Sequence, residues 1–272
     1  MKQRIVIEAV KPWKPFDFAE IFRYRDMLYF KIINAYKADH RQTILSYFWA
    51  VIDPFTKIIF FYLIFGKIAH VATGHIPYLA FNASGIVLWN FIGICLNTSI
   101  SSLTNESMLL QKIYFPRLFI PLVPCISQVP NFLLNLVITL GLLAFLGFTP
   151  TWRLLGIFPI FLFSIVIAYS VGLLLSSYAL QYRDIRRLWG GIMQFMVYTV
   201  PVAYPLSAVP PLWRNVYLLN PMAAAVEGFR CSLLGQPVPW MWLGIDAVVV
   251  FIIFYFSAGI FRMREPLIID AA

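Results

Sequence analysis

Charged side chains are scarce in this sequence, and their scarcity limits the solvent in which the chain can fold. Only 12% of the 272 residues are charged, whereas 61% are hydrophobic. A soluble domain of this composition would expose more apolar surface than it could bury. The composition therefore predicts a protein whose main solvent is a lipid bilayer.

The sequence also has no glycine-rich loop of the kind that cradles phosphates. The Gly66-Lys67 pair lacks both the upstream glycine and the following hydroxyl that such a loop requires. We therefore expect no catalytic residue and no cofactor on this chain. If the protein does energy-driven work, ATP and Mg²⁺ would be bound by a partner subunit.

Cysteine and histidine are few, with three residues of each. Cys95, Cys125 and Cys231 lie in apolar stretches without metal-ligand spacing, so they are predicted to pack as small hydrophobic side chains. His70 and His75 have no carboxylate partners beside them. The sequence therefore predicts no metal site.

Acidic residues are outnumbered by basic ones, which leaves a formal net charge of +9. A basic balance suits nucleic acid, but membrane proteins also keep Lys and Arg in their cytoplasmic loops. We therefore expect membrane lipids, and no nucleic acid, as partners of these charges. The polar start of the chain lacks the apolar core of a cleavable signal peptide, so none is predicted.

Long apolar stretches fill the chain between Phe48 and Phe261 and are separated by short basic loops. A helix needs about 20 apolar residues to cross a hydrocarbon core roughly 30 Å thick, and it satisfies its own backbone in lipid. The pattern predicts an all-α integral membrane protein in which residues 44–272 form one transmembrane domain. The six predicted transmembrane helices cover residues 47–68, 78–100, 118–146, 154–180, 188–204 and 240–261.

The first predicted span contains two charges and a proline. Asp53 can cap a helix and Pro54 suits the first helical position, which predicts that the helix restarts there. Lys57 follows Asp53 by four residues on the same face, and the two are expected to pair because an unpaired charge is costly in lipid. Three prolines predict a tilt or kink in the third span, namely Pro121, Pro124 and Pro130.

Residues 1–43 form an extended polar arm with nine Lys or Arg residues. Asp17 and Glu20 resemble a capping box and predict the start of a helix. Lys31 is expected to lie away from the apolar face of this helix. A basic amphipathic helix before the first span is predicted to lie in the membrane interface, although a solvated cytoplasmic arm also fits the charges. The apolar face is formed at helical spacing by Phe18, Ile21, Phe22, Leu28, Ile32 and Tyr36.

Basic residues are unevenly divided between the two sides of the predicted membrane domain. They gather in the arm, in the loops after the second and fourth spans, and in the tail. The positive-inside rule therefore places both termini in the cytoplasm and requires an even number of crossings. Four basic residues remain for the other side: Lys67, Arg153, Arg214 and Arg230.

The apolar segment 206–235 cannot be a further span, because a seventh crossing would make the number of crossings odd. Asn220 as a cap, Pro221 at the first position and Gly235 as a stop predict a short helix over residues 222–234. At 1.5 Å per residue this helix would be about 20 Å long, which is too short to cross. The segment is therefore predicted to be a re-entrant helical hairpin between the fifth and sixth spans. Glu227 and Arg230 would lie there in a wet or protein-lined setting.

Four stretches of the sequence together match a known pattern. They are YFWAVIDP at 47–54, QKIYFPR at 111–117, YRDI at 182–185 and LNPMAAAVEGFR at 219–230. In this order they make the chain resemble the type-2 ATP-binding-cassette exporter permeases, and most of all the transmembrane subunit of bacterial O-antigen polysaccharide exporters. The resemblance covers nearly the whole chain.

The resemblance implies a multi-pass homodimer in the bacterial inner membrane, with each copy bound to a separate nucleotide-binding ATPase subunit. It implies a cargo polysaccharide on an undecaprenyl-diphosphate carrier, moved from the cytoplasm to the periplasm. The arm would be an interface or gate helix, and the hairpin with Asn220, Pro221, Glu227 and Arg230 would cap the pathway externally. Coupling to the ATPase would involve Met108, Leu109, Gln111, Lys112, Tyr114, Phe115, Pro116, Arg117, Tyr182, Arg183 and Asp184.

Aromatic residues make up 17% of the sequence, and those beside polar or proline-broken stretches are candidates to line a sugar path. Interfacial belts and lipid-facing rings account for most of the others. The path candidates are Trp89, Asn90, Asn97, Tyr198 and Tyr204. A diphosphate would need cations at the cytoplasmic entrance, although anionic lipid explains the same cations equally well. These cations are Arg23, Arg25, Lys31, Lys37 and Arg41.

Other functions remain open at this stage. The same architecture could export capsule polysaccharide, teichoic acid, a drug or a lipid. A membrane-embedded glycosyl- or phospho-transferase is a more distant alternative, because the cytoplasmic loops offer single acids such as Glu106 and Asp184 and no pair for metal or acid–base work.

Overall fold

The computed structural model describes residues 24–41, 46–106 and 116–271, and every regular element in these residues is helical. The longer elements are α2 (Arg25–Arg41), α3 (Ser46–Phe61), α4 (Tyr78–Asn105), α6 (Leu122–Ser127), α7 (Val129–Phe145), α8 (Ile157–Ala179), α9 (Asp184–Thr199), α10 (Pro211–Leu218), α11 (Pro221–Leu233) and α12 (Trp240–Ala271). A π-helix, Tyr62–Ile68, continues α3. Short 3₁₀ turns cover Arg117–Phe119, Trp152–Gly156 and Leu206–Ala208.

Within the described ranges, five helical stretches are long and apolar enough to cross a membrane. They match five of the six predicted spans and cover Phe48–Ile68, Tyr78–Asn105, Arg117–Phe145, Trp152–Ala179 and Trp240–Glu265. The predicted fifth span falls on α9, which has only 16 residues and ends at Thr199. At 1.5 Å per residue α9 is about 24 Å long, shorter than the roughly 30 Å of a hydrocarbon core.

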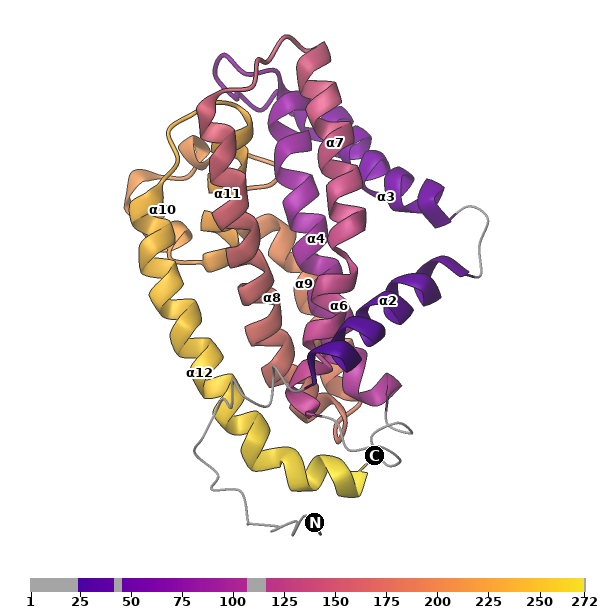
Figure 1. Ribbon diagram of the computed structural model, residues 1–272. Helices are drawn as coiled ribbons and strands as arrows, with labels where there is room; N and C mark the ends of the chain where they lie inside the picture. The colour runs from indigo at the N-terminus through magenta and orange to yellow at the C-terminus, as the bar shows by residue number, and fades with distance from the viewer. Residues whose placement is uncertain (1–23, 42–45, 107–115, 272) are drawn as a thin grey trace.

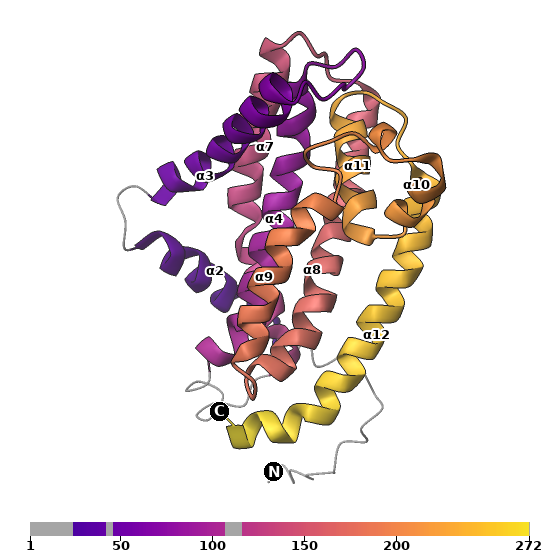
Figure 2. The same cartoon turned by 180° about the vertical axis from the view of Figure 1, so that it is seen from behind.

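The helices surround α4, which is the most deeply buried of the five span-length stretches. It packs against α3, α7, α8, α9 and α11, while α12 packs along α8. Figures 1 and 2 show α2 and α3 projecting from one side of this bundle, with α12 running along the opposite side. The hydrophobic core therefore lies between α4, α8 and α11, and α3 is left largely exposed.

Helices α4 and α8 approach each other closely at Gly172. A Cβ atom on Gly172 would lie 2.6 Å from the Cβ of Ser99. The hydroxyl of Ser99 donates to the carbonyl of Pro121 at 2.7 Å. A small residue at such a contact lets two membrane helices approach closely and gain van der Waals packing.

The third predicted span is interrupted near its prolines, as expected. The 3₁₀ turn at Arg117–Phe119 is followed by α6, and Gln128 separates α6 from α7. Pro130 then lies in the first turn of α7, where its missing N–H costs little. Gln128 lies at the break between α6 and α7, and two further polar residues, Asn131 and Asn135, follow it on α7.

The prediction that a helix restarts at Asp53-Pro54 is wrong, because α3 passes through Pro54 without a break. Proline cannot donate to the carbonyl four residues earlier, which is that of Ala50. The side-chain amide of Asn135 on α7 donates to this carbonyl at 3.2 Å. Asn82 on α4 likewise donates to the carbonyl of Ile58 at 2.9 Å. Neighbouring helices therefore replace the lost backbone bond and allow α3 to continue.

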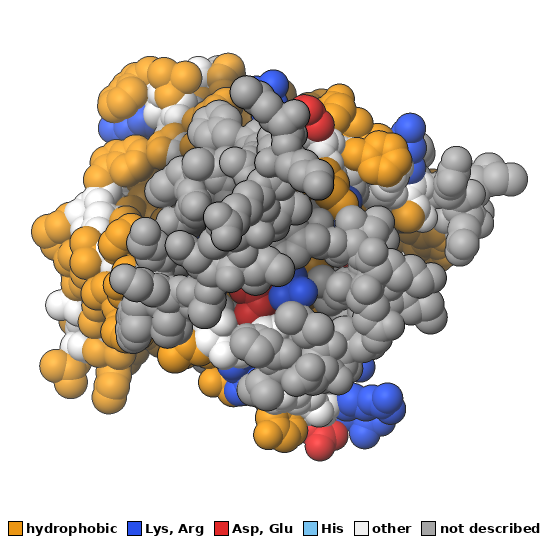
Figure 3. All heavy atoms as spheres, turned by 60° about the horizontal axis from the view of Figure 1, so that its bottom comes forward, with side chains coloured by type: hydrophobic (Ala, Val, Ile, Leu, Met, Phe, Trp, Pro, Cys, Tyr) orange, Lys and Arg blue, Asp and Glu red, His pale blue; other side chains and the backbone are white. Residues whose placement is uncertain are grey.

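One end of the bundle, which we call the base, holds the carboxyl ends of α4 and α8, the start of α9 and the last turns of α12 (Figure 1). Seen from this end, Lys and Arg side chains lie around the edge and hydrophobic side chains cover the flanks (Figure 3). The predicted cytoplasmic loops thus meet at one end. The basic residues of the base include Arg117, Arg183, Arg186, Arg187, Arg262 and Arg264.

Candidate functional site

The base brings together the described members of the two predicted coupling loops. Pro116 is buried and Arg117 is nearly so, whereas Tyr182, Arg183 and Asp184 form an exposed turn before α9. This turn could meet a partner without rearrangement of the bundle. The other predicted coupling residues lie outside the described residues: Met108, Leu109, Gln111, Lys112, Tyr114 and Phe115.

Two side chains tie the carboxyl end of α12 to the base. The guanidinium of Arg117 lies 2.9 Å from the carboxylate of Glu265. The guanidinium of Arg264 lies 3.8 Å from the centroid of the Tyr178 ring and also donates to the side chain of Gln181. The predicted sixth span ended at residue 261, and the helix continues past these contacts to Ala271.

Helix α2 packs against α6 near the base, with Leu28, Ile32 and Tyr36 at least partly covered as the predicted apolar face requires. The prediction for Lys31 is wrong, since its side chain points into the bundle and pairs with Glu106 at the end of α4. Only 13% of the Lys31 side chain is exposed. A cation beside the carboxyl end of α4 also complements the helix dipole.

The remaining predicted diphosphate-binding cations are only partly described. Arg25 and Lys37 are exposed on α2, and Arg25 pairs with Asp26 at 3.5 Å. Arg23 and the side chain of Arg41 lie outside the described residues, as do the capping pair Asp17 and Glu20.

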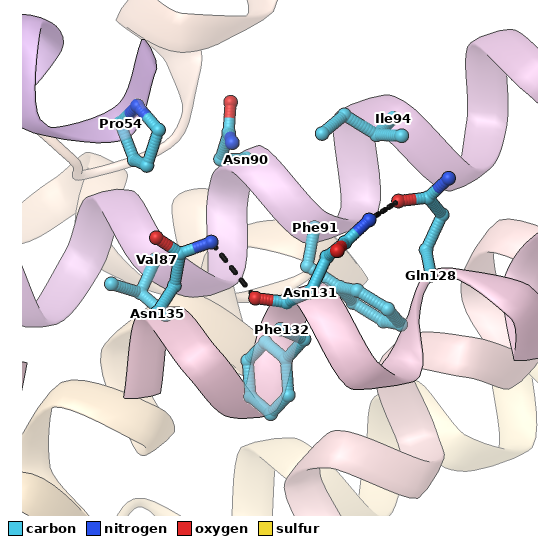
Figure 4. A pocket seen from close by; sticks show the side chains of 9 residues that line it. All are labelled: Pro54, Val87, Asn90, Phe91, Ile94, Gln128, Asn131, Phe132 and Asn135. Carbon is cyan, nitrogen blue, oxygen red and sulfur yellow. Dashed lines mark hydrogen bonds between the residues drawn. The ribbon is translucent and has the colours of Figure 1, made fainter. Parts of the chain in front are cut away.

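A row of polar side chains lies between α3, α4 and α7 (Figure 4). Lys57 pairs with Asp53 at 2.9 Å, which confirms the predicted ion pair, and also donates to the carboxamide of Asn90 at 2.7 Å. Asn131 donates to the side chain of Gln128 at 2.8 Å. The side chains of Asn90, Gln128, Asn131 and Asn135 line a slot of about 20 Å³, which has room for a single water molecule and not for a sugar ring.

The predicted path residues do not converge on this slot. Trp89 is packed in the hydrophobic core, whereas Asn97 is exposed on α4 and Tyr198 is exposed on α9. Tyr204 donates to the backbone carbonyl of Tyr198, and its hydroxyl lies 2.6 Å from that of Tyr217. Only Asn90 among the five candidates lines the slot. The missed residues Gln128, Asn131 and Asn135 share one helix face at spacings of three and four, which is the signal that could have found them.

The opposite end of the bundle is organised by Arg230 of α11. Its guanidinium is 1% exposed, pairs with Glu227 at 2.5 Å, and donates to the carbonyls of Phe81, Pro201 and Val202. Tyr78 donates to the next carbonyl, that of Ala203, at 2.6 Å. The backbone that follows α9 is not helical here, so these side chains supply the hydrogen bonds that lipid cannot.

The predicted short helix is present as α11. Asn220 accepts from the backbone N–H of Met222 at 3.1 Å, Pro221 occupies the first turn, and Gly235 has a φ of +69° just after the helix end. These positions confirm the cap, the start and the stop. Helix α10 was not predicted, although Pro211 at its first turn is an ordinary start signal.

Asp246 on α12 is a further residue that the sequence reasoning missed. Its side chain is fully buried, and neither carboxylate oxygen has a hydrogen-bond partner among the described residues. The signal was a lone acid inside an apolar run, which is expensive in a membrane span.

The three cysteines are buried and free. Cys95 and Cys125 lie close together, with the thiol of Cys95 3.8 Å from the carbonyl of Cys125. They pack as small side chains, as predicted.

Comparisons with known proteins find relatives along most of the chain. The sequence profile of a family described as ABC-2 type transporter matches residues 33–234. The O-antigen export system permease protein RfbA of Myxococcus xanthus is 24% identical over 253 residues, which cover 90% of this chain and 95% of that protein. Two proteins of the same name from Klebsiella pneumoniae are 23% identical over 228 residues and 24% identical over 211 residues. They cover 83% and 77% of this chain, and 87% and 80% of their own lengths.

Proposed function

Because the chain belongs to the ABC-2 type transporter family, we propose that it is the permease subunit of an ATP-driven exporter of an O-antigen polysaccharide. As a member of this family, the chain is a multi-pass inner-membrane transport component that works with an ATP-binding subunit. The cargo assignment is carried by one observation, the similarity to O-antigen export permeases along 90% of the chain.

The proposed cargo is linked to undecaprenyl diphosphate and moves from the cytoplasm to the periplasm. Each functional unit contains two copies of this chain and two ATPase subunits that bind ATP and Mg²⁺. The base faces the cytoplasm, and the gathering of arginines there supports this orientation. Both termini then lie on the cytoplasmic side.

Six crossings follow if α9 and the backbone after it form the fifth span together. Residues 200–203 continue from α9, and their backbone is held by Arg230 and Tyr78. Helices α10 and α11 would then form the external re-entrant hairpin. The capping contacts of Asn220 and the burial of Arg230 support a hairpin that protein covers.

The ATPase is proposed to dock on the base, at residues 108–117 and at the exposed turn Tyr182, Arg183 and Asp184. The polar row between α3, α4 and α7 is proposed to face the glycan when α3 moves outward. The slot is too narrow for sugar in the described conformation, so contact of these side chains with a glycan requires such a movement. The large exposed surface of α3 is consistent with a helix that can shift.

Reconstitution in inverted vesicles tests this proposal. The chain and its ATPase are inserted together, and an undecaprenyl-diphosphate-linked O-antigen polysaccharide is presented on the outer surface. ATP should carry the glycan into the lumen, where added glycosidase no longer cleaves it. The chain alone should hydrolyse no ATP. Hydrolysis by the lone chain would overturn the division of labour, and movement of teichoic acid or capsule polymer without O-antigen would overturn the cargo.

A further inference from the structure

We propose that Glu106 and Glu265 are positioning residues that anchor the two flanks of the proposed coupling segment, residues 107–115, to different helices. Glu106 ties the preceding flank to α2, and Glu265 ties the following flank to α12. This inference rests on the proposed function, because it assigns these contacts a role in coupling ATP hydrolysis to transport.

The first anchor joins α2 to the end of α4. Glu106 is the carboxyl cap of α4, and its backbone N–H donates to the carbonyl of Ser102. Its carboxylate pairs with the ammonium of Lys31, and the two side chains are 32% and 13% exposed. Because α2 precedes α3 in the chain, a displacement of Glu106 would pull on the element that leads into the polar row.

The second anchor joins the 3₁₀ turn after the segment to α12. Arg117 begins this turn, and its guanidinium lies 2.9 Å from the carboxylate of Glu265. The Arg117 side chain is 11% exposed and that of Glu265 is 33% exposed. Figure 1 shows the last turns of α12 crossing the base beneath the ends of the other helices.

The two ion pairs bracket the segment on both sides, and each pair is partly withdrawn from water. A fully exposed pair contributes little, whereas removing one partner of a buried pair leaves a charge without compensation. Each ion pair therefore opposes a movement in which one flank of the segment shifts while its partner helix stays in place. A force applied to the segment by an ATPase is expected to reach α2 through Glu106 and α12 through Glu265.

Charge exchange separates this role from the other role proposed for Lys31, that of binding diphosphate. Lys31→Glu and Glu106→Lys each break the first pair, and the double variant restores it with the charges reversed. If Lys31 binds diphosphate, the double variant should stay defective, because residue 31 is then acidic. If Lys31 is part of an anchor, the double variant should regain the lost coupling, because the ion pair is restored. Arg117→Glu, Glu265→Arg and their double variant test the second anchor in the same way.

The experiment uses the whole complex with its ATPase in proteoliposomes and measures the amount of glycan moved per ATP hydrolysed. Each single variant should lower this ratio by about threefold to tenfold, since partly buried pairs lie between the exposed and buried cases. Each double variant should return to within about twofold of the unmodified chain. Asp26→Lys is the control for Glu106→Lys, because it makes the same reversal of charge at an exposed site on α2.

Size-exclusion chromatography checks that every variant forms the complex, and Lys31→Gln with Glu106→Gln replaces any variant that fails to assemble. Unchanged ratios in the single variants, or double variants that assemble without recovering the ratio, would overturn the proposal. Failure of the proposed function looks different, because the unmodified complex would then move no polysaccharide. In that case the stimulation of the ATPase by the permease serves as the readout for the same variants.

Discussion

The guanidinium of Arg230 lies 3.8 Å from the centroid of the Phe81 ring, and its Nε donates to the carbonyl of the same residue at 3.2 Å. One side chain of α11 thus binds both the face and the backbone of a residue on α4. The same guanidinium holds the carbonyls of Pro201 and Val202. Arg230 is therefore the point at which α4, α11 and the backbone after α9 are joined.

Arg230→Lys should destabilise the protein almost as much as Arg230→Ala. The ammonium of lysine cannot reproduce the planar fork that contacts three carbonyls, Glu227 and the ring. We expect a loss of about 3–5 kcal/mol, because either change leaves buried carbonyls without their donors, and the alanine variant also leaves Glu227 unpaired. Thermal unfolding in detergent measures the effect, with the exposed Arg187→Lys as control. An unfolding midpoint for Arg230→Lys equal to that of the control would contradict this role.

Gly85→Ala should weaken the same junction although Arg230 itself is kept. A Cβ at this position would lie 2.6 Å from Nη2 of Arg230. The guanidinium must then move, which loses part of its contact with the carbonyl of Pro201. We expect about 1–3 kcal/mol of destabilisation. The effect should vanish in an Arg230→Ala background, where nothing remains to clash.

Asn135→Ala should be costly only while Pro54 is present. The carbonyl of Ala50 loses its ordinary donor to Pro54 and receives one from Asn135 instead. Leaving that carbonyl unsatisfied should cost about 1–3 kcal/mol. In Pro54→Ala the backbone N–H returns, and the cost of Asn135→Ala should fall to less than half. A double-mutant cycle by thermal unfolding measures the coupling, and simple additivity would refute this account of α3.

Gly172→Ala should destabilise the contact between α4 and α8. The added Cβ would meet the Cβ of Ser99 at 2.6 Å, and overpacking of this kind costs about 1–3 kcal/mol. Gly190→Ala on α9 is the matched control, because nothing lies within 4 Å of the added atom. The control should be neutral or stabilising, since alanine favours a helix. Equal midpoints for the two variants would rule out a tight contact at Gly172.

The orientation of the bundle can be read from cysteine labelling. The native cysteines are buried, so they give a low background for a membrane-impermeant maleimide. We expect Gln236→Cys to react in intact cells and Arg187→Cys to react only after the cells are opened. Labelling of residue 236 from the cytosol alone would remove both the external hairpin and the proposed six-span topology.

The helical segments were largely predictable because lipid imposes strict conditions on a chain. Apolar length identified five stretches that the structure contains, and prolines identified the break around Gln128. The signals at Asn220, Pro221 and Gly235 identified α11 because capping depends on neighbouring residues alone. The ion pair between Asp53 and Lys57 was predictable for the same reason, since four residues in a helix bring two side chains to one face.

Contacts between distant residues could not be predicted in this way. The capping preferences of Asp53 and Pro54 predicted a helix start at Pro54. The helix instead continues through Pro54, because the side-chain amide of Asn135 on α7 donates to the carbonyl of Ala50. Local periodicity placed Lys31 away from the bundle, and a carboxylate 75 residues later draws it inward. The path candidates were chosen as separate residues, and only Asn90 proved to line the polar slot.

The sequence by itself determined that this chain resides in a membrane, which stretches are helical, and to which family it belongs, because hydropathy, capping and motif order are properties of neighbouring residues. The tertiary structure alone decided which polar side chains meet between α3, α4 and α7, which groups Arg230 contacts, and which residues the flanks of residues 107–115 pair with. The physical reason is that buried polar groups must find partners wherever the fold brings them, and those partners are far apart along the chain.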